Sequence, residues 1–167
     1  GCAIRDTTQS NIKEAVEAAR KADLVILAVG GSSARDFKTK YINTGAATVD
    51  SENSGILSDM ECGEGFDRAT LDLLGDQEKL IRAIAATEKP LVTVYIAGRP
   101  LNMNLASEVS DALLTAWYPG EQGGNGIVDV LTGKYNPSGR LPMSVPQHVG
   151  QIPVHYSQGT LRDYMDC

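Results

Sequence analysis

Three short, mostly apolar segments constrain the fold of this 167-residue chain more than any other feature. They cover residues 23–30, 91–97 and 111–118, and each is followed by a turn that contains glycine or proline. A continuous apolar run without polar alternation, such as residues 23–30, is typical of a strand in a parallel sheet. We therefore expect the first of these strands to be buried on both faces.

Segments with helical periodicity alternate with these strands. Ser10 is a candidate N-cap for the first helix, and Gly133 is a natural C-cap for the last one. An edge strand is also expected at residues 141–145, because proline is tolerated at a sheet edge. The expected helices cover residues 13–21, 76–86, 101–106 and 127–131.

The alternation of strand and helix predicts an α/β fold in a single domain over residues 1–167. The expected architecture is a mostly parallel sheet sandwiched between helices, with three layers and a flavodoxin-like appearance. In such sheets, functional sites form outside the carboxyl ends of the strands. A long irregular stretch, residues 34–74, leaves from the first of these strand ends, and long loops within compact domains are commonly functional.

Composition excludes several classes of function. The net charge of −6 disfavours nucleic acid and anionic membranes as partners. No segment approaches the roughly 18 consecutive apolar residues of a membrane span. The cysteines, Cys2, Cys62 and Cys167, lack the spacing of a zinc site, so we expect free thiols and no metal. His148 and His155 are interpreted as surface or structural residues.

Residues 60–68, Met-Glu-Cys-Gly-Glu-Gly-Phe-Asp-Arg, carry three acids and one arginine in a segment punctuated by glycines. Loops at strand ends often hold catalytic groups, and a carboxylate there is a candidate general acid or base. An ordinary solvated acidic loop is the alternative interpretation. Cys62 as a nucleophile is a further alternative, but both histidines are far from it in sequence.

Nucleotide-binding motifs are incomplete in this chain. Residues 30–35 lack the third glycine of the dinucleotide fingerprint, and Gly133-Lys134 lacks both the earlier glycine and the following Ser or Thr of a P-loop. The nucleophile-elbow pattern of α/β-hydrolases is absent from the sequence. A flavodoxin-like phosphate site at the first strand end stays open.

Two motifs in a fixed order carry a more specific signal. The first is Gly63-Glu64-Gly65-Phe66-Asp67-Arg68, and the second is Asn136-Pro137-Ser138-Gly139-Arg140-Leu141-Pro142. Between them lie Gln77, the segment Gly98-Arg99-Pro100-Leu101 and the strand and turn of residues 112–120. From about residue 12 to residue 156, the chain resembles the C-terminal α/β sandwich domain of family 3 glycoside hydrolases, which are β-glucosidases, β-xylosidases and exo-glucanases.

The resemblance implies a retaining exo-β-glycosidase that removes terminal β-linked glucose or xylose from oligosaccharides or glycosides. Family members pair this domain with an N-terminal barrel domain that carries the nucleophilic aspartate, and the active site lies between the two. The sandwich domain supplies the general acid/base, which by position in the motif is Glu64. Glu61 is the closest competitor and Glu52 a weaker one. The resemblance implies neither a cofactor nor a metal.

Other charged residues near the motif have two interpretations. For Asp67 and Arg68, an internal salt bridge that shapes the loop is favoured over contact with substrate. Arg35 and Asp36 either line the cleft or are solvated.

The chain begins Gly1-Cys2-Ala3-Ile4, and we expect it to be part of a longer protein. A (β/α)₈ barrel needs about 200 or more residues, so the nucleophile is expected elsewhere and the isolated domain is expected to be inactive. The resemblance places the parent protein in the periplasm or outside the cell. Two other functions stay open: a non-catalytic carbohydrate-binding or interface module, and a flavodoxin-like nucleotide binder.

Overall fold

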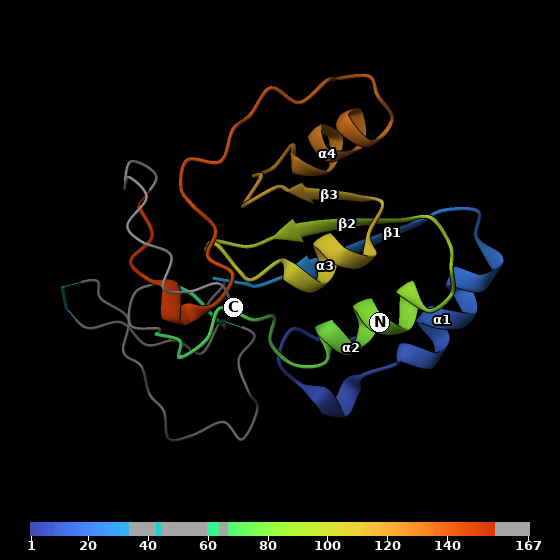
Figure 1. Ribbon diagram of the computed structural model, residues 1–167, viewed down its shortest axis with the longest axis horizontal. Coiled ribbons are helices and arrows are strands. Elements are labelled where there is room, and N and C mark those ends of the chain that lie inside the picture. The colour runs from blue at the N-terminus through green and yellow to red at the C-terminus, as the bar shows by residue number, and fades with distance from the viewer. Residues whose placement is uncertain (34–42, 45–59, 64–66, 156–167) are drawn as a thin grey trace.

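The computed structural model describes residues 1–33, 43–44, 60–63 and 67–155. Within them, a three-stranded parallel sheet has the order β1-β2-β3 (Figure 1). The strands are β1 (Val25–Gly30), β2 (Leu91–Ile96) and β3 (Ala112–Thr115). Val25 pairs with Leu91, and Val92 pairs with Ala112, so all three strands run in the same direction. The α/β class and the parallel sheet predicted from the sequence are confirmed.

Helices connect these strands as the sequence pattern predicted. Gly133, with φ of +74°, follows the last helix in the left-handed conformation that a C-terminal glycine cap adopts. The α-helices are α1 (Ile12–Lys21), α2 (Gln77–Ala85), α3 (Asn104–Val109) and α4 (Gly123–Leu131), and two short 3₁₀ helices cover Thr7–Gln9 and Val149–Gln151. None of the helices in the described part of the chain is long and apolar enough to cross a membrane.

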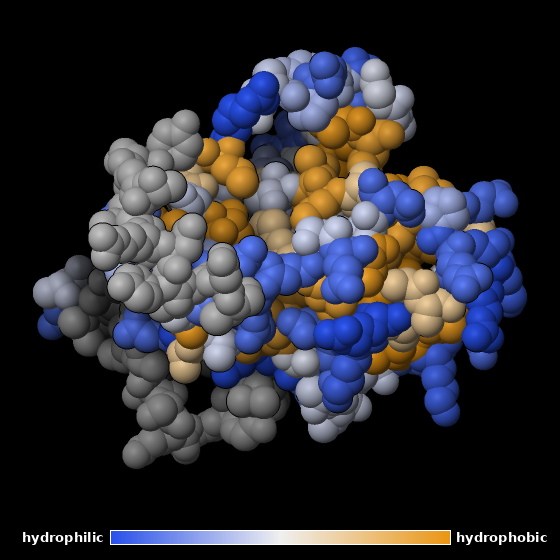
Figure 2. All heavy atoms as spheres, in the orientation of Figure 1, coloured by the Kyte–Doolittle hydropathy of each residue, from blue (hydrophilic) through white to orange (hydrophobic). Residues whose placement is uncertain are grey.

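The hydrophobic core lies between one face of the sheet and the helices α1, α2 and α3. Leu27 and Tyr95 point from the sheet into this layer, and Ile81 of α2 and Ala106 of α3 are fully buried opposite them. Polar side chains cover the outer surfaces of α1 and α2, as amphipathic helices require (Figure 2). Burial of a side chain such as Ile81 stabilises the fold by about 1.5–3 kcal/mol.

The second face of β1 is more exposed than its apolar sequence predicted. Ile26 is 54% exposed and lies on the face opposite Leu27, so the expectation that this strand is buried on both faces is wrong. The reason is that helices α1–α3 all pack against the Leu27 face, whereas α4 lies beside β3 (Figure 1). A continuous apolar run indicates a strand, but it does not show how many of its faces are covered.

Several elements differ from the expectations. Asn11, not Ser10, caps α1 by accepting a hydrogen bond from the backbone N–H of Glu14, because the Ser10 hydroxyl instead donates to Asp76. Helix α3 starts at Asn104, three residues later than expected. Residues 141–145 form no strand.

Candidate functional site

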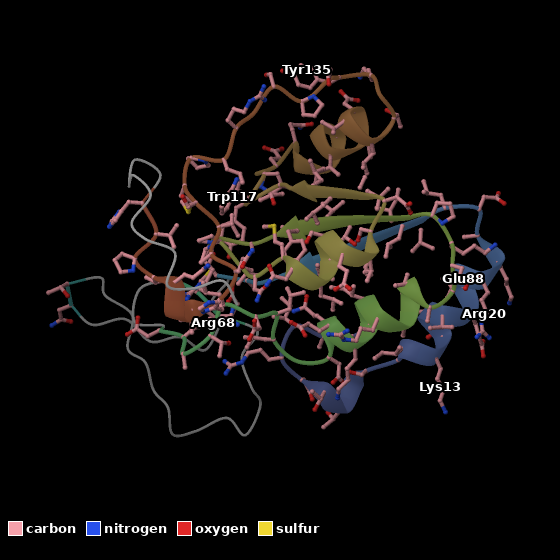
Figure 3. All side chains as sticks on the ribbon, viewed as in Figure 1. Lys13, Arg20, Arg68, Glu88, Trp117 and Tyr135 are labelled. Atoms are coloured by element: carbon pink, nitrogen blue, oxygen red, sulfur yellow. The ribbon has the colours of Figure 1, made fainter. Side chains whose placement is uncertain are left out.

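The carboxyl ends of the three strands meet at one edge of the sheet, because parallel strands all point the same way. The segment Met60–Gly63 returns to this edge, where the Glu61 backbone N–H donates to the carbonyl of Ser32 at 2.8 Å. Ser32 and Met60 form an isolated parallel bridge beyond the end of β1. Arg68 and Trp117 lie at this end of the molecule, whereas Lys13, Arg20 and Glu88 lie at the opposite end (Figure 3). The start of the acidic motif is therefore attached to the edge where a site was expected.

A buried ion pair joins the two sides of the motif. Arg68 Nη1 donates to Glu61 Oε2 at 2.5 Å, and the two side chains are only 8% and 1% exposed. The same guanidinium also donates, through Nη2, to the backbone carbonyl of Asp72. A charge-assisted bond between an arginine and a carboxylate is among the stronger hydrogen bonds in proteins. Residues 61 and 68 are thus held together across the segment that contains Glu64.

Two further residues from strand ends fix the Glu61 carboxylate. Arg99, which follows β2, places its Nε 3.9 Å from Glu61 Oε2. A Cβ atom added at Gly31 would lie 1.9 Å from Glu61 Oε1, so only glycine leaves room for the carboxylate at this position. Oε1 itself has no hydrogen-bond partner among the described residues. The carboxylate is therefore enclosed by the ends of β1 and β2.

Cys62 is buried and meets a residue that follows β3. Its Sγ lies 2.9 Å from the hydroxyl of Tyr118, whose ring packs so closely on Gly98 that a Cβ there would come within 2.5 Å of it. Burial raises the pKa of the Tyr118 hydroxyl, and the hydrogen bond with Cys62 raises it further. Trp117, next to Tyr118, has φ of +53°, an uncommon conformation for a bulky residue. These contacts tie the segment to a third strand end.

Gln77 stabilises the end of β1 from the first turn of α2. Its Oε1 accepts from the Gly30 N–H at 2.8 Å, and its Nε2 donates to the Gly30 carbonyl at 2.9 Å. The Nε2 group also donates to the carbonyls of Leu74 and Ile4. One buried amide thus satisfies both backbone groups of Gly30 at the point where the chain leaves the sheet.

A pocket of about 230 Å³ opens beside the ion pair. The Arg5 side chain donates to the carbonyl of Met60 at 3.5 Å along its wall. Positive, negative and apolar side chains all line this pocket. It is lined by Arg5, Met60, Glu61, Asp67, Arg68, Ala69, Thr70 and Leu74.

The predicted site residues divide into two groups. Glu61, Asp67 and Arg68 are described, and the first and last of them are brought together, while Asp67 is exposed. The residues Glu64, Arg35, Asp36 and Glu52 lie outside the described residues.

The partners of Glu61 were not predicted from the sequence. The roles of Arg99 and Gly31 follow from their close approach to one carboxylate. The signal in the sequence was the glycine pair Gly30-Gly31, which ends β1. No group of three or more His, Cys, Asp or Glu side chains that could hold a metal ion occurs in the described ranges.

A family model and two relatives of known name match nearly the whole chain. The model of the glycosyl hydrolase family 3 C-terminal domain matches residues 2–165. A beta-xylosidase from Formosa agariphila is 39% identical over 156 residues, which cover 93% of this chain and 18% of the relative. A periplasmic beta-glucosidase from Salmonella typhimurium is 41% identical over 149 residues, which cover 89% of this chain and 16% of the relative.

Solved structures show the same relationship. The beta-glucosidase from Listeria innocua in complex with glucose superimposes with a TM-score of 0.71 at 31% identity, covering 93% of this chain and 18% of that one. The chain thus spans less than one fifth of the length of these relatives.

Proposed function

Because the chain belongs to the glycosyl hydrolase family 3 C-terminal domain family, we propose that it is the acid/base-bearing domain of a retaining exo-β-glycosidase. The proposed substrates are oligosaccharides or glycosides with a terminal β-linked glucose or xylose. Relatives named beta-glucosidase and beta-xylosidase support this choice of sugars. The chain would be one domain of a longer polypeptide, and its partner would be an N-terminal barrel domain of that polypeptide.

Glu64 is the proposed proton donor. The observation that favours it is the burial of the other acidic candidate in the same segment, because Glu61 is enclosed beside Gly31 and paired with Arg68. A general acid must come within hydrogen-bond distance of the oxygen that it protonates. A carboxylate that is 1% exposed and held by a guanidinium does not meet this requirement. Arg68 is accordingly a loop-shaping residue, and Arg35 and Asp36 stay candidates for the cleft.

The reaction proceeds in two steps in this proposal. An aspartate of the barrel domain attacks the anomeric carbon, and Glu64 gives its proton to the departing glycosidic oxygen. Water then releases the sugar from the glycosyl-enzyme, with the Glu64 carboxylate now accepting a proton from that water. The two carboxyl groups must lie about 5 Å apart for this retaining mechanism. The closeness of the anchored segment to the carboxyl ends of the strands supports its presentation toward a neighbouring domain.

The test uses the full-length polypeptide and an aryl β-glucoside or β-xyloside. Replacing the acid should lower turnover by about 10²–10⁴-fold in Glu64→Ala, and added azide should restore turnover with formation of a glycosyl azide. Glu17→Ala, an exposed change on helix α1, is the matched control and should keep its activity. Normal kinetics in Glu64→Ala would refute the assignment, and turnover by the 167-residue chain alone would refute the need for a second domain.

The proposed location is the periplasm or the exterior of the cell. It is supported by the name of the Salmonella relative, a periplasmic beta-glucosidase. Fractionation of the native host, with activity measured in each fraction, tests this part of the proposal.

A further inference from the structure

We propose that Glu61 and Arg68 are positioning residues, whose buried ion pair fixes the two ends of the segment that presents Glu64. This inference rests on the proposed function, because it assigns the ion pair a role in proton donation. Neither side chain contacts the substrate in this proposal. Both act through the backbone of the residues between them.

The first support is the closure of the segment. Residues 61 and 68 are seven positions apart, and their side chains meet at 2.5 Å inside the protein. The Arg68 guanidinium also holds the Asp72 carbonyl, so the far end of the segment is fixed to the chain that continues toward α2. Residues 61 and 68 are therefore held at a fixed separation before any substrate arrives.

The second support is the attachment of this ion pair to the sheet. The backbone of Glu61 is bonded to Ser32, and its carboxylate lies between Arg68 and Arg99 against the backbone of Gly31. The ends of β1 and β2 are themselves held in the sheet by their mutual pairing. Through the ion pair, both residue 61 and residue 68 are therefore held at a fixed position relative to β1 and β2.

The third support is the chemistry of burial. A buried ion pair is often no more stabilising than well-packed apolar residues of similar size. Stability alone therefore does not explain why two charges are buried here. The planar Arg68 guanidinium, in contrast, holds two acceptors in fixed directions, the Glu61 carboxylate through Nη1 and the Asp72 carbonyl through Nη2. The pair thus suits a role in which direction and distance matter. Misplacing a catalytic group by about 1 Å costs on the order of 100-fold in rate.

The test distinguishes positioning of the acid from a general structural role. Full-length Glu61→Gln, Arg68→Gln and Arg68→Lys variants are assayed on two aryl β-glycosides that differ only in the leaving group. Phenolate needs a proton to depart, whereas 2,4-dinitrophenolate departs without one. The ratio kcat/KM is measured because it reports the glycosylation step, in which the proton is given.

If the ion pair positions the acid, kcat/KM on the phenyl glycoside falls roughly 10- to 100-fold, while that on the dinitrophenyl glycoside changes less than about threefold. The Glu61→Gln/Arg68→Gln double variant is then no worse than the poorer single variant, because each change removes the same interaction. Lys134→Gln, which breaks the exposed ion pair with Asp129 of α4, is the matched control and leaves kcat/KM on both substrates unchanged.

Equal losses on both substrates, or a lower melting temperature with an unchanged leaving-group ratio, would overturn the inference and leave a structural role. Arg68→Lys and the isosteric Glu61→Gln keep the test valid if Arg68→Gln does not fold. Glu64→Ala, assayed beside them, separates this failure from failure of the proposed function. If Glu64→Ala shows neither the leaving-group selectivity nor rescue by azide, the acid assignment itself is wrong.

Discussion

Replacement of Gln77 by leucine tests the structural account of the strand end most directly. Leucine has a similar volume and is also tolerated in the first turn of a helix, so the change removes hydrogen bonds with little effect on packing. Gln77 is 4% exposed, and its amide bonds to both the N–H and the C=O of Gly30. In the variant, these two backbone groups stay buried without a partner.

The magnitude follows from those two groups. A buried donor or acceptor that loses its partner costs about 1–3 kcal/mol, so the pair predicts a loss of about 2–6 kcal/mol in the free energy of unfolding. The bonds from Gln77 to Leu74 and Ile4 are left out of this sum, because both are only partly buried. A loss of this size is a large fraction of the stability of a typical domain.

The assay is urea unfolding of the chain, followed by the fluorescence of Trp117, which is its single tryptophan. Arg82→Gln, an exposed change on the same helix, is the control and should lie within about 0.5 kcal/mol of the wild type. A loss below about 1 kcal/mol in Gln77→Leu would show that Gly30 finds other partners. The account of how β1 ends would then be wrong.

Two further changes probe the neighbouring contacts. Gly31→Ala should destabilise the chain by about 1–3 kcal/mol, because the new Cβ overlaps the Glu61 carboxylate. In a Glu61→Ala background, which lacks that carboxylate, the same Gly31→Ala change should cost less in the same urea assay. Asp76 accepts hydrogen bonds from Lys79 and Ser10, which hold the pKa of its carboxyl below the usual range. A lowered folded-state pKa contributes stability above the unfolded value near about pH 4, and this stability is lost as the pH falls through the folded value. Asp76→Asn should therefore flatten the acid side of the stability profile, and a profile parallel to that of the wild type would contradict this.

The strands were predictable because their apolar runs are short and bounded by turns, but their exact extents were not. Residues 111–118 suggested a strand of full length, and β3 stops at Thr115. The backbone of Trp117 then turns into the left-handed region, which a bulky side chain rarely adopts without support from its surroundings. That support comes from residues far away in sequence, such as the Cys62 thiol beside Tyr118. Local sequence propensity cannot predict such a long-range contact.

The partner of Arg68 was likewise not predictable from the local sequence. An internal salt bridge involving Arg68 was expected, with Asp67 as the adjacent acid. In the structure Arg68 instead reaches Glu61, because Glu61 is buried at the strand ends whereas Asp67 is exposed. A nearby charge in water gains little from pairing, while a buried carboxylate requires a partner. Burial decides which acid is chosen, and burial is set by the tertiary fold.

Gly31 determines where the Glu61 carboxylate can lie. Gly31 was visible only as part of a turn after an apolar run, yet its missing side chain is what allows the Glu61 carboxylate to lie against the end of β1. If any side chain stood there, Glu61 would have to move away from Arg68 and Arg99, and the anchor of the following segment would shift with it. The requirement for glycine at this position therefore arises from a residue thirty positions further along the chain. A substitution at a sheet end can in this way shift the anchor of the segment proposed to present Glu64.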